Sequence, residues 1–215
     1  LLEWEVREAT GDEHEIALEA TGPLLVLAPS PAARRNRGVY FTPMRLVESL
    51  VERALAPWND DPRGLSRVTI LDLACGGGRH SHYFLERGHG VTAVDRDISK
   101  LSPRDGLEII HHDLEDGRPW PLAGRRFAAV VVVNYLHRPL FQHLVAAVAP
   151  GGLLLYDTFA MGNEAFGRPS NPDFLLQPDE LTDLVAGALE VVDYFHGRVE
   201  TPKPAIKQQI CARRK

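Results

Sequence analysis

The sequence predicts an α/β fold built on a doubly wound, mostly parallel sheet that ends in an antiparallel hairpin. From residue 68 to residue 158, apolar strand-like runs alternate with helical segments. Strands that are apolar throughout and alternate with helices are typical of a parallel sheet covered on both faces. In the last part of the chain, two strand-like runs follow each other with no room for a helix, and such runs pair antiparallel.

Five runs are expected to form the parallel part of the sheet and two to form the hairpin. The expected parallel strands cover residues 68–73, 91–95, 107–111, 127–133 and 152–158. Helical spacing marks residues 79–87 and 139–148 between them. The hairpin is expected from residues 191–197 and 206–212.

Residues 1–42 are expected to form an N-terminal extension, followed by one domain over residues 43–215. Residues 16–20 alternate apolar and other side chains and residues 24–27 form an apolar run, which indicates a β-hairpin. Thr42 and Pro43 then have the residue types of a helix N-cap and first turn, and an apolar face follows at helical spacing.

Composition argues against several classes of protein. The 215 residues carry a formal net charge of −5, so no overall basic field draws the chain onto nucleic acid or an anionic membrane. The longest apolar stretch, residues 127–133, is too short to span a bilayer, and no basic-then-apolar leader opens the chain. Two cysteines give neither a disulfide framework nor a metal cluster. We expect a cytoplasmic protein with no metal and no membrane partner, and the oligomeric state stays open.

A glycine-rich turn carries the main binding signal. The strand expected at residues 68–73 runs into three glycines at 76–78 and then into a helix. Glycines let the backbone approach a ligand closely, and the helix N-terminus offers free N–H groups. Asp95 ends the next strand, 17 residues after Gly78, where an acidic residue suits two ribose hydroxyls. A dinucleotide-binding turn needs a further glycine where His80 and Ser81 stand, which disfavours an NAD-dependent oxidoreductase.

These residues resemble the first two motifs of class I S-adenosylmethionine-dependent methyltransferases. Residues 71–78 are similar to the motif D/E-x-G-x-G-x-G with Ala74 in place of the first glycine, and residues 91–95 are similar to the second motif. The resemblance implies a Rossmann-like methyltransferase sheet with S-adenosyl-L-methionine as cofactor. The implied contacts are Asp72 to the methionine ammonium, the backbone at Ala74, Gly76 and Gly78 to the methionine part, and Asp95 to the ribose. Arg79 either contacts the methionine carboxylate or is a solvated residue of the first helical turn.

Two further motifs extend the resemblance. His112-Asp113-Leu114 is similar to the third motif, which implies that Asp113 lies near the adenine amino group and Leu114 near its ring. Asn134 and Tyr135 follow the fourth strand, where the family's fourth motif contacts cofactor and substrate. His137 has an unperturbed pKa near neutrality and could act as a base, although a helix-entry role is the simpler interpretation. Methyl transfer from a sulfonium needs alignment more than covalent help, so no catalytic dyad is required.

The N-terminal half resembles a different group of methyltransferases. Residues 37–43, which include Tyr40, are similar to the segment before the first motif of amino-directed DNA adenine methyltransferases, and arginines at 34, 35 and 37 could contact phosphates. Both prolines of that group's Asn/Asp-Pro-Pro-Tyr motif are absent after Asn134, and no target-recognition domain is evident. We therefore favour a loop and helix that cover the cofactor pocket.

The long segment 159–177 is expected to be a loop that covers the acceptor. Its glycines, aromatic side chains and polar residues suit a lid, with Phe166 and Arg168 as candidate acceptor contacts. Packing of the loop onto the domain is the alternative, in which case the acceptor site would lie around Tyr40 and Tyr135. The chain from residue 68 onward also resembles small bacterial tellurite-resistance-like methyltransferases. We expect methyl transfer to a small-molecule or other soluble acceptor; the alternatives are adenine methylation of nucleic acid and a non-catalytic cofactor-binding partner subunit.

Overall fold

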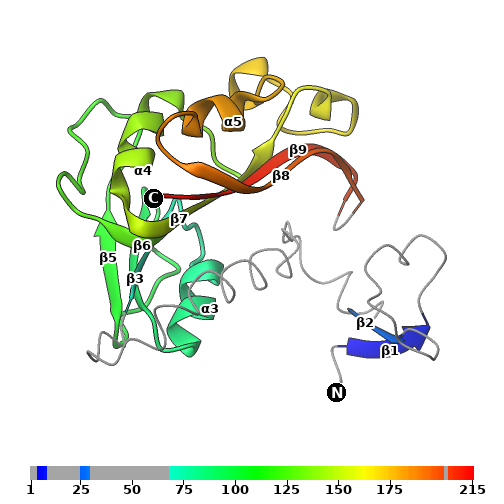
Figure 1. Ribbon diagram of the computed structural model, residues 1–215. Helices are drawn as coiled ribbons and strands as arrows, with labels where there is room; N and C mark the ends of the chain where they lie inside the picture. Colours follow the sequence, from blue (N-terminus) through cyan, green and yellow to red (C-terminus); the bar gives the residue numbers. More distant parts are fainter. Residues whose placement is uncertain (1–3, 9–24, 30–67, 201–202) are drawn as a thin grey trace. The chain divides into compact units, whose positions relative to one another are not determined.

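The computed structural model describes residues 4–8, 25–29, 68–200 and 203–215 of the chain (Figure 1). The chain divides into two compact units, Leu1–Tyr40 and Phe41–Lys215. The first contains a two-stranded sheet and the second a seven-stranded sheet. In the described part of the chain, no helix combines the length and the apolar character that crossing a membrane requires.

The N-terminal unit contains a strand that the alternation pattern did not indicate. β1 (Trp4–Glu8) and β2 (Leu25–Pro29) pair antiparallel, with Trp4 opposite Pro29 and Glu8 opposite Leu25. β2 overlaps the expected strand at 24–27, and its pairing with β1 was not predicted because the apolar run at 24–27 specifies a strand without specifying which segment it pairs with. Residues 16–20, the arginines at 34–37 and the helix expected after Pro43 lie outside the described residues.

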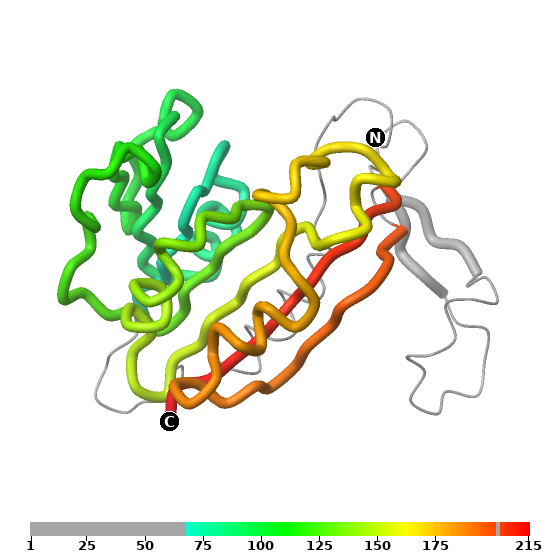
Figure 2. Tube along the Cα trace, turned by 90° about the horizontal axis from the view of Figure 1, so that it is seen from above, coloured from blue at the N-terminus to red at the C-terminus, as the bar shows by residue number. Residues whose placement is uncertain are grey.

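The larger unit is built on a seven-stranded sheet that confirms the predicted fold class (Figures 1 and 2). Its parallel strands are β3 (Thr69–Leu73), β4 (Gly90–Asp95), β5 (Leu107–His111), β6 (Phe127–Val133) and β7 (Val148–Phe159). The hairpin of β8 (Glu190–Val199) and β9 (Ala205–Arg213) joins this sheet because β9 pairs antiparallel with β7. The strand order is β5-β4-β3-β6-β7-β9-β8, so the chain reverses direction across the sheet between β3 and β6.

Helices cover both faces of the sheet, as the apolar strands require. α3 (Arg79–Glu86) packs on one face, and α4 (Phe141–Ala147) and α5 (Glu180–Val185) pack on the other (Figure 1). Strand side chains alternate between faces, so β3 directs Ile70 toward the α3 side and Leu71 and Leu73 toward the α4 and α5 side. The two resulting cores hold the carboxyl ends of the parallel strands in fixed positions.

The connection between β6 and β7 differs from the helix expected over residues 139–148. A 3-10 turn, η2 (Arg138–Leu140), precedes α4 because Pro139 sits in its first turn. α4 ends at Ala147, since Val148 has extended backbone angles (φ −72°, ψ 126°) and pairs with Phe127. β7 therefore starts at Val148 rather than at residue 152.

Candidate functional site

The glycine turn after β3 adopts backbone conformations that only certain residues tolerate. Ala74, Gly76 and Gly78 have positive φ angles of 52°, 55° and 74°. A Cβ atom at Gly78 would lie 2.3 Å from Cδ2 of Leu101, so this position needs glycine for space as well as for conformation. Among the described residues, no atom lies within 4 Å of a Cβ placed at Gly76.

The Asp95 carboxylate is fixed against the glycine turn. The backbone N–H of Gly76 donates to Asp95 Oδ2 at 2.7 Å, and the N–H of Asp97 donates to Asp95 Oδ1 at 2.9 Å. A carboxylate has about four lone-pair sites, so two acceptor sites are left for another partner. The end of β4 thus presents a pre-positioned acceptor beside the turn.

A cavity of about 160 Å³ opens at the carboxyl ends of the parallel strands. Its lining residues come from the ends of four neighbouring strands, and they are Ala74, Asp95, Arg96, His112, Asp113, Leu114, Glu115 and Tyr135. Five of these were predicted from the sequence: Ala74, Asp95, Asp113, Leu114 and Tyr135. Arg96, His112 and Glu115 were not, although each lies next to a predicted residue and that adjacency was a usable signal. This crevice lies where ligands bind in open α/β sheets.

Tyr135 is one of the residues that line this cavity. Its hydroxyl oxygen is buried and has no hydrogen-bond partner within the described residues. Burial and the neighbouring Glu115 carboxylate raise the pKa of Tyr135 well above its ordinary value, so the phenol stays protonated at neutral pH. Tyr135 lines the cavity together with Asp95 and Asp113, and its predicted catalytic role stays a prediction.

Asp72 is buried beneath the turn rather than open to the cavity. It is 2% exposed, and its Oδ2 accepts hydrogen bonds from the N–H (2.8 Å) and the hydroxyl (2.6 Å) of Ser81. Burial raises the pKa of Asp72 to about 6, against the opposing effect of the Ser81 hydrogen bonds. In this structure the carboxylate ties β3 to the first turn of α3, and its predicted contact with a methionine ammonium stays a prediction.

Asn134 belongs to a buried polar group that we call the Lys207 cluster: Asn134, Asp157, Lys207 and Gln209. Lys207 Nζ donates to Asp157 Oδ1 at 2.5 Å and to Asn134 Oδ1 at 2.7 Å. Gln209 Nε2 donates to Asp157 Oδ2 at 2.7 Å. Sequence reasoning missed Asp157, Lys207 and Gln209. The usable signal was polar residues inside apolar strands, since a buried charge requires a partner.

Arg79 and His80 lie between this cluster and the glycine turn. Burial, together with the positive charges of Arg79 and Lys207, lowers the pKa of His80 to about 4, so its ring is neutral at pH 7. Burial also lowers the pKa of Arg79, and the Asp72 and Asp157 carboxylates oppose that effect. Arg79 is therefore half-buried among charges rather than a solvated residue of the first turn.

The segment after β7 is anchored at both ends. Arg138 donates to the carbonyls of Asp173 and Leu175, both at 2.8 Å, and forms a two-point ion pair with Glu180 at 2.5 and 2.9 Å. The buried Asn163 donates to the Pro169 carbonyl at 2.9 Å. Two 3-10 turns, η3 (Asn163–Ala165) and η4 (Pro172–Phe174), replace the irregular loop that the sequence suggested.

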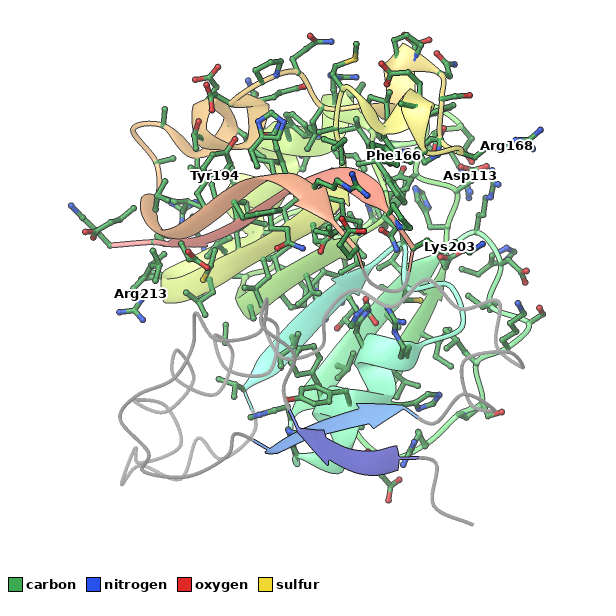
Figure 3. All side chains as sticks on the ribbon, turned by 90° about the vertical axis from the view of Figure 1, so that its right-hand side faces the viewer. Asp113, Phe166, Arg168, Tyr194, Lys203 and Arg213 are labelled. Atoms are coloured by element: carbon green, nitrogen blue, oxygen red, sulfur yellow. The ribbon has the colours of Figure 1, made fainter. Side chains whose placement is uncertain are left out.

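Among the described residues that line the cavity, neither Phe166 nor Arg168 is found. Phe166 is 41% exposed with the Arg198 guanidinium 5.1 Å from its ring centre, and Arg168 extends outward (Figure 3). In Figures 1 and 2 their segment lies on the opposite side of the molecule from the loop after β5. His137 precedes η2, as a helix-entry residue would, and it too is outside the cavity lining. Tyr40 lies outside the described residues. The acceptor roles of Phe166, Arg168 and Tyr40 stay predictions.

The sheet order, the reversed last strand and the cavity at the strand ends define a class I methyltransferase fold. The structure is similar to TehB from Haemophilus influenzae, with a TM-score of 0.59 and 17% identity, covering 84% of this chain and 64% of that one. In sequence, the chain is similar to the malonyl-[acyl-carrier protein] O-methyltransferases of Salmonella typhimurium (31% identity over 108 residues, 46% of this chain and 42% of the relative) and Serratia marcescens (30% over 143 residues, 63% and 54%). The chain thus spans about half the length of these relatives. No family model matches the sequence.

Proposed function

We propose that this chain binds S-adenosylmethionine at the carboxyl ends of β3 to β6 and transfers its methyl group to a small-molecule or other soluble acceptor. The observation that carries the proposal is the placement of Asp95, whose carboxylate is held by the Gly76 N–H at the edge of a cavity that also contains Asp113 and Tyr135. The likeness of the sequence to curated methyltransferases supports it.

The residues present fit the nucleoside part of this cofactor. The two remaining acceptor sites of Asp95 match the two ribose hydroxyls. Asp113 can accept from the adenine amino group while Leu114 offers an apolar contact to the ring. A cavity of about 160 Å³ is smaller than the several hundred Å³ typical of a pocket for a whole ligand. The methionine part would therefore lie along the turn at Gly76.

The cofactor, when bound, supplies an activated methyl group on a sulfonium. The chain's own residues then have three tasks: to hold the nucleoside, to align the acceptor and to exclude water. The rigid glycine turn and the strand ends perform the first task. Asn134 lies at the end of β6, next to β3 across the point where the strand order reverses, and this position supports a contact between Asn134 and the acceptor.

Calorimetric titration with S-adenosylmethionine, S-adenosylhomocysteine and NAD tests the binding part of the proposal. We expect both sulfur nucleotides to bind and NAD not to bind. Tight NAD binding without either sulfur nucleotide contradicts the proposal.

Transfer of labelled methyl groups to a small-molecule extract, to DNA and to RNA tests the acceptor. We expect the label in the small-molecule fraction. Label in DNA or RNA supports adenine methylation instead, and binding of the cofactor with transfer only after a second protein is added supports a partner-subunit role.

A further inference from the structure

The Asn134 amide is held in one orientation by Lys207. The Lys207 ammonium can only donate hydrogen bonds, so the amide group 2.7 Å away must turn its carbonyl oxygen toward it. The two N–H bonds of Asn134 Nδ2 consequently point away from Lys207. Asn134 is half-buried, and the described residues provide no hydrogen-bond acceptor for Nδ2.

The ammonium that sets this orientation is itself fixed. Lys207 and Asp157 are both 6% exposed, and their ion pair of 2.5 Å is supported by Gln209 on the other carboxylate oxygen. Asp157 also accepts the backbone N–H of Asn134 at 2.8 Å through its carbonyl oxygen. Asn134 is therefore held at both its backbone and its side chain by neighbouring strands, and it keeps the left-handed φ of 55° that this position requires.

Asn134 lies next to the strand that leads into the glycine turn, and it is not among the described residues that line the cavity of about 160 Å³. Asn134 directly follows β6, which pairs with β3 through Leu73 and Val132, and the glycine turn begins just after Leu73. The crevice between these two strand ends is the point where the strand order reverses. We propose, building on methyl transfer as the function, that the acceptor atom is a carboxylate oxygen that Asn134 Nδ2 binds through one lone pair.

An amine acceptor fits this arrangement poorly. Its N–H bonds would face the N–H bonds of Asn134, and the Asn134 oxygen is already engaged by Lys207. An amine must also lose a proton in the course of methylation. Within the described residues around Asn134, the Asp157 carboxylate is committed to Lys207 and Gln209, and the Asp72 carboxylate is committed to Ser81.

A carboxylate acceptor balances without a base. A lone pair on the acceptor oxygen forms the new O–CH₃ bond, the C–S bond breaks, and its electron pair goes to sulfur. The products are a methyl ester and a neutral thioether, and no proton is released because the carboxylate carries none. The Asn134 donor holds the second lone pair of the attacking oxygen and so orients the first toward the methyl.

The chemical stability of the transferred label tests the proposal. S-adenosylmethionine with a tritiated methyl group is incubated with the chain and a low-molecular-weight bacterial extract. Separate incubations replace the extract with an acid (succinate, glutarate or phenylacetate) or with the matched amine (putrescine, cadaverine or phenethylamine). Methyl esters release volatile methanol in mild alkali, whereas N-methyl groups do not. We expect alkali-labile label from the extract and from at least one acid, and none from the amines.

Variants of the Lys207 cluster test the geometry. Asn134→Gly keeps the left-handed backbone and the Lys207–Asp157 pair but removes the donor, so kcat/KM for the acid should fall at least about tenfold, equivalent to about 1.4 kcal/mol. Lys207→Met should lower kcat/KM for the acid by a similar factor, and it should raise the ratio of amine to acid methylation because the Asn134 amide can then rotate. Lys207→Arg should restore the preference for the acid. Gln208→Met is the matched control, since Gln208 is equally buried on β9 and binds Gln177 and Leu181 instead.

The outcomes separate this inference from the proposed function. If S-adenosylhomocysteine does not bind in a parallel titration, the proposed function itself fails. If it binds and the transferred label is alkali-stable, only the carboxylate assignment is overturned. If it binds and neither the acids nor any extract component is labelled, the carboxylate assignment and methyl transfer to a small molecule are both overturned. Equal effects of Gln208→Met and Asn134→Gly on acid kinetics would also overturn it, because the loss would then come from folding.

Discussion

Removal of the Asp95 carboxylate should weaken cofactor binding far more than it weakens the fold. In the empty protein, Asp95→Ala deprives two backbone N–H groups of their acceptors, those of Gly76 and Asp97. Both hydrogen bonds lie at an exposed position, so water can replace the carboxylate and each loss should cost about 1 kcal/mol or less.

The cofactor-bound state loses more free energy, because both proposed hydrogen bonds from the ribose hydroxyls to the charged Asp95 carboxylate disappear together. Each is worth about 1.5–3 kcal/mol, so the affinity for S-adenosylhomocysteine should fall by about 3 kcal/mol or more, which is roughly a hundredfold. The assay is calorimetric titration, with the melting temperature recorded on the same samples. Asp97→Ala is the control, since Asp97 lies two residues further on and is not among the described lining residues. Unchanged affinity in folded Asp95→Ala would refute the reasoning, because Asp95 would then serve only to close the turn.

Three further expectations follow from the turn, the buried carboxyl and the anchored segment. Gly78→Ala places a Cβ 2.3 Å from Leu101 Cδ2 at a φ of 74°, so urea unfolding should show a loss of about 1–3 kcal/mol; a variant as stable as the parent would mean that the turn rearranges freely. The pKa of Asp72 is about 6 in the folded chain, above the ordinary 3.8, so the folded state retains the proton and stability relative to Asp72→Asn should fall by roughly 3 kcal/mol as pH rises from about 3 to about 7. A flat difference between the two proteins across that window would contradict burial as the cause. Phe166→Ala with Arg168→Ala should lower turnover or acceptor affinity with cofactor binding and melting temperature near the parent, whereas an early melt with intact kinetics would make the segment purely structural.

Several residues that line the cavity at the strand ends could be predicted from the sequence, because each lies at or just beyond the end of a strand. Ala74 directly follows β3 and Asp95 ends β4, while Asp113 and Tyr135 lie two residues beyond the ends of β5 and β6. Parallel strands bring their carboxyl ends to one edge of the sheet. Recognising the strands was therefore enough to bring these side chains together, without knowledge of the register between strands.

The Lys207 cluster could not be predicted from the positions of the strands alone. Lys207 meets Asp157 only through the antiparallel pairing of β9 with β7, in which Asp157 lies opposite Gln209 and Phe159 opposite Lys207. A shift of one residue would turn Lys207 to the other face, and the sequence pattern does not define register to that precision. The pairing of β1 with β2 was missed for the same reason, since an apolar run does not specify its partner.

In the segment after β7, the residues that anchor the backbone are different from the residues whose side chains are exposed. Arg138 and Asn163 fasten its backbone, and the fully buried Leu175 and Leu176 seal its second end. Residues 164–168 are exposed and make none of these anchoring contacts. Substitution of these exposed residues should therefore cost little folding stability, because the anchoring contacts that hold the backbone of the segment stay in place.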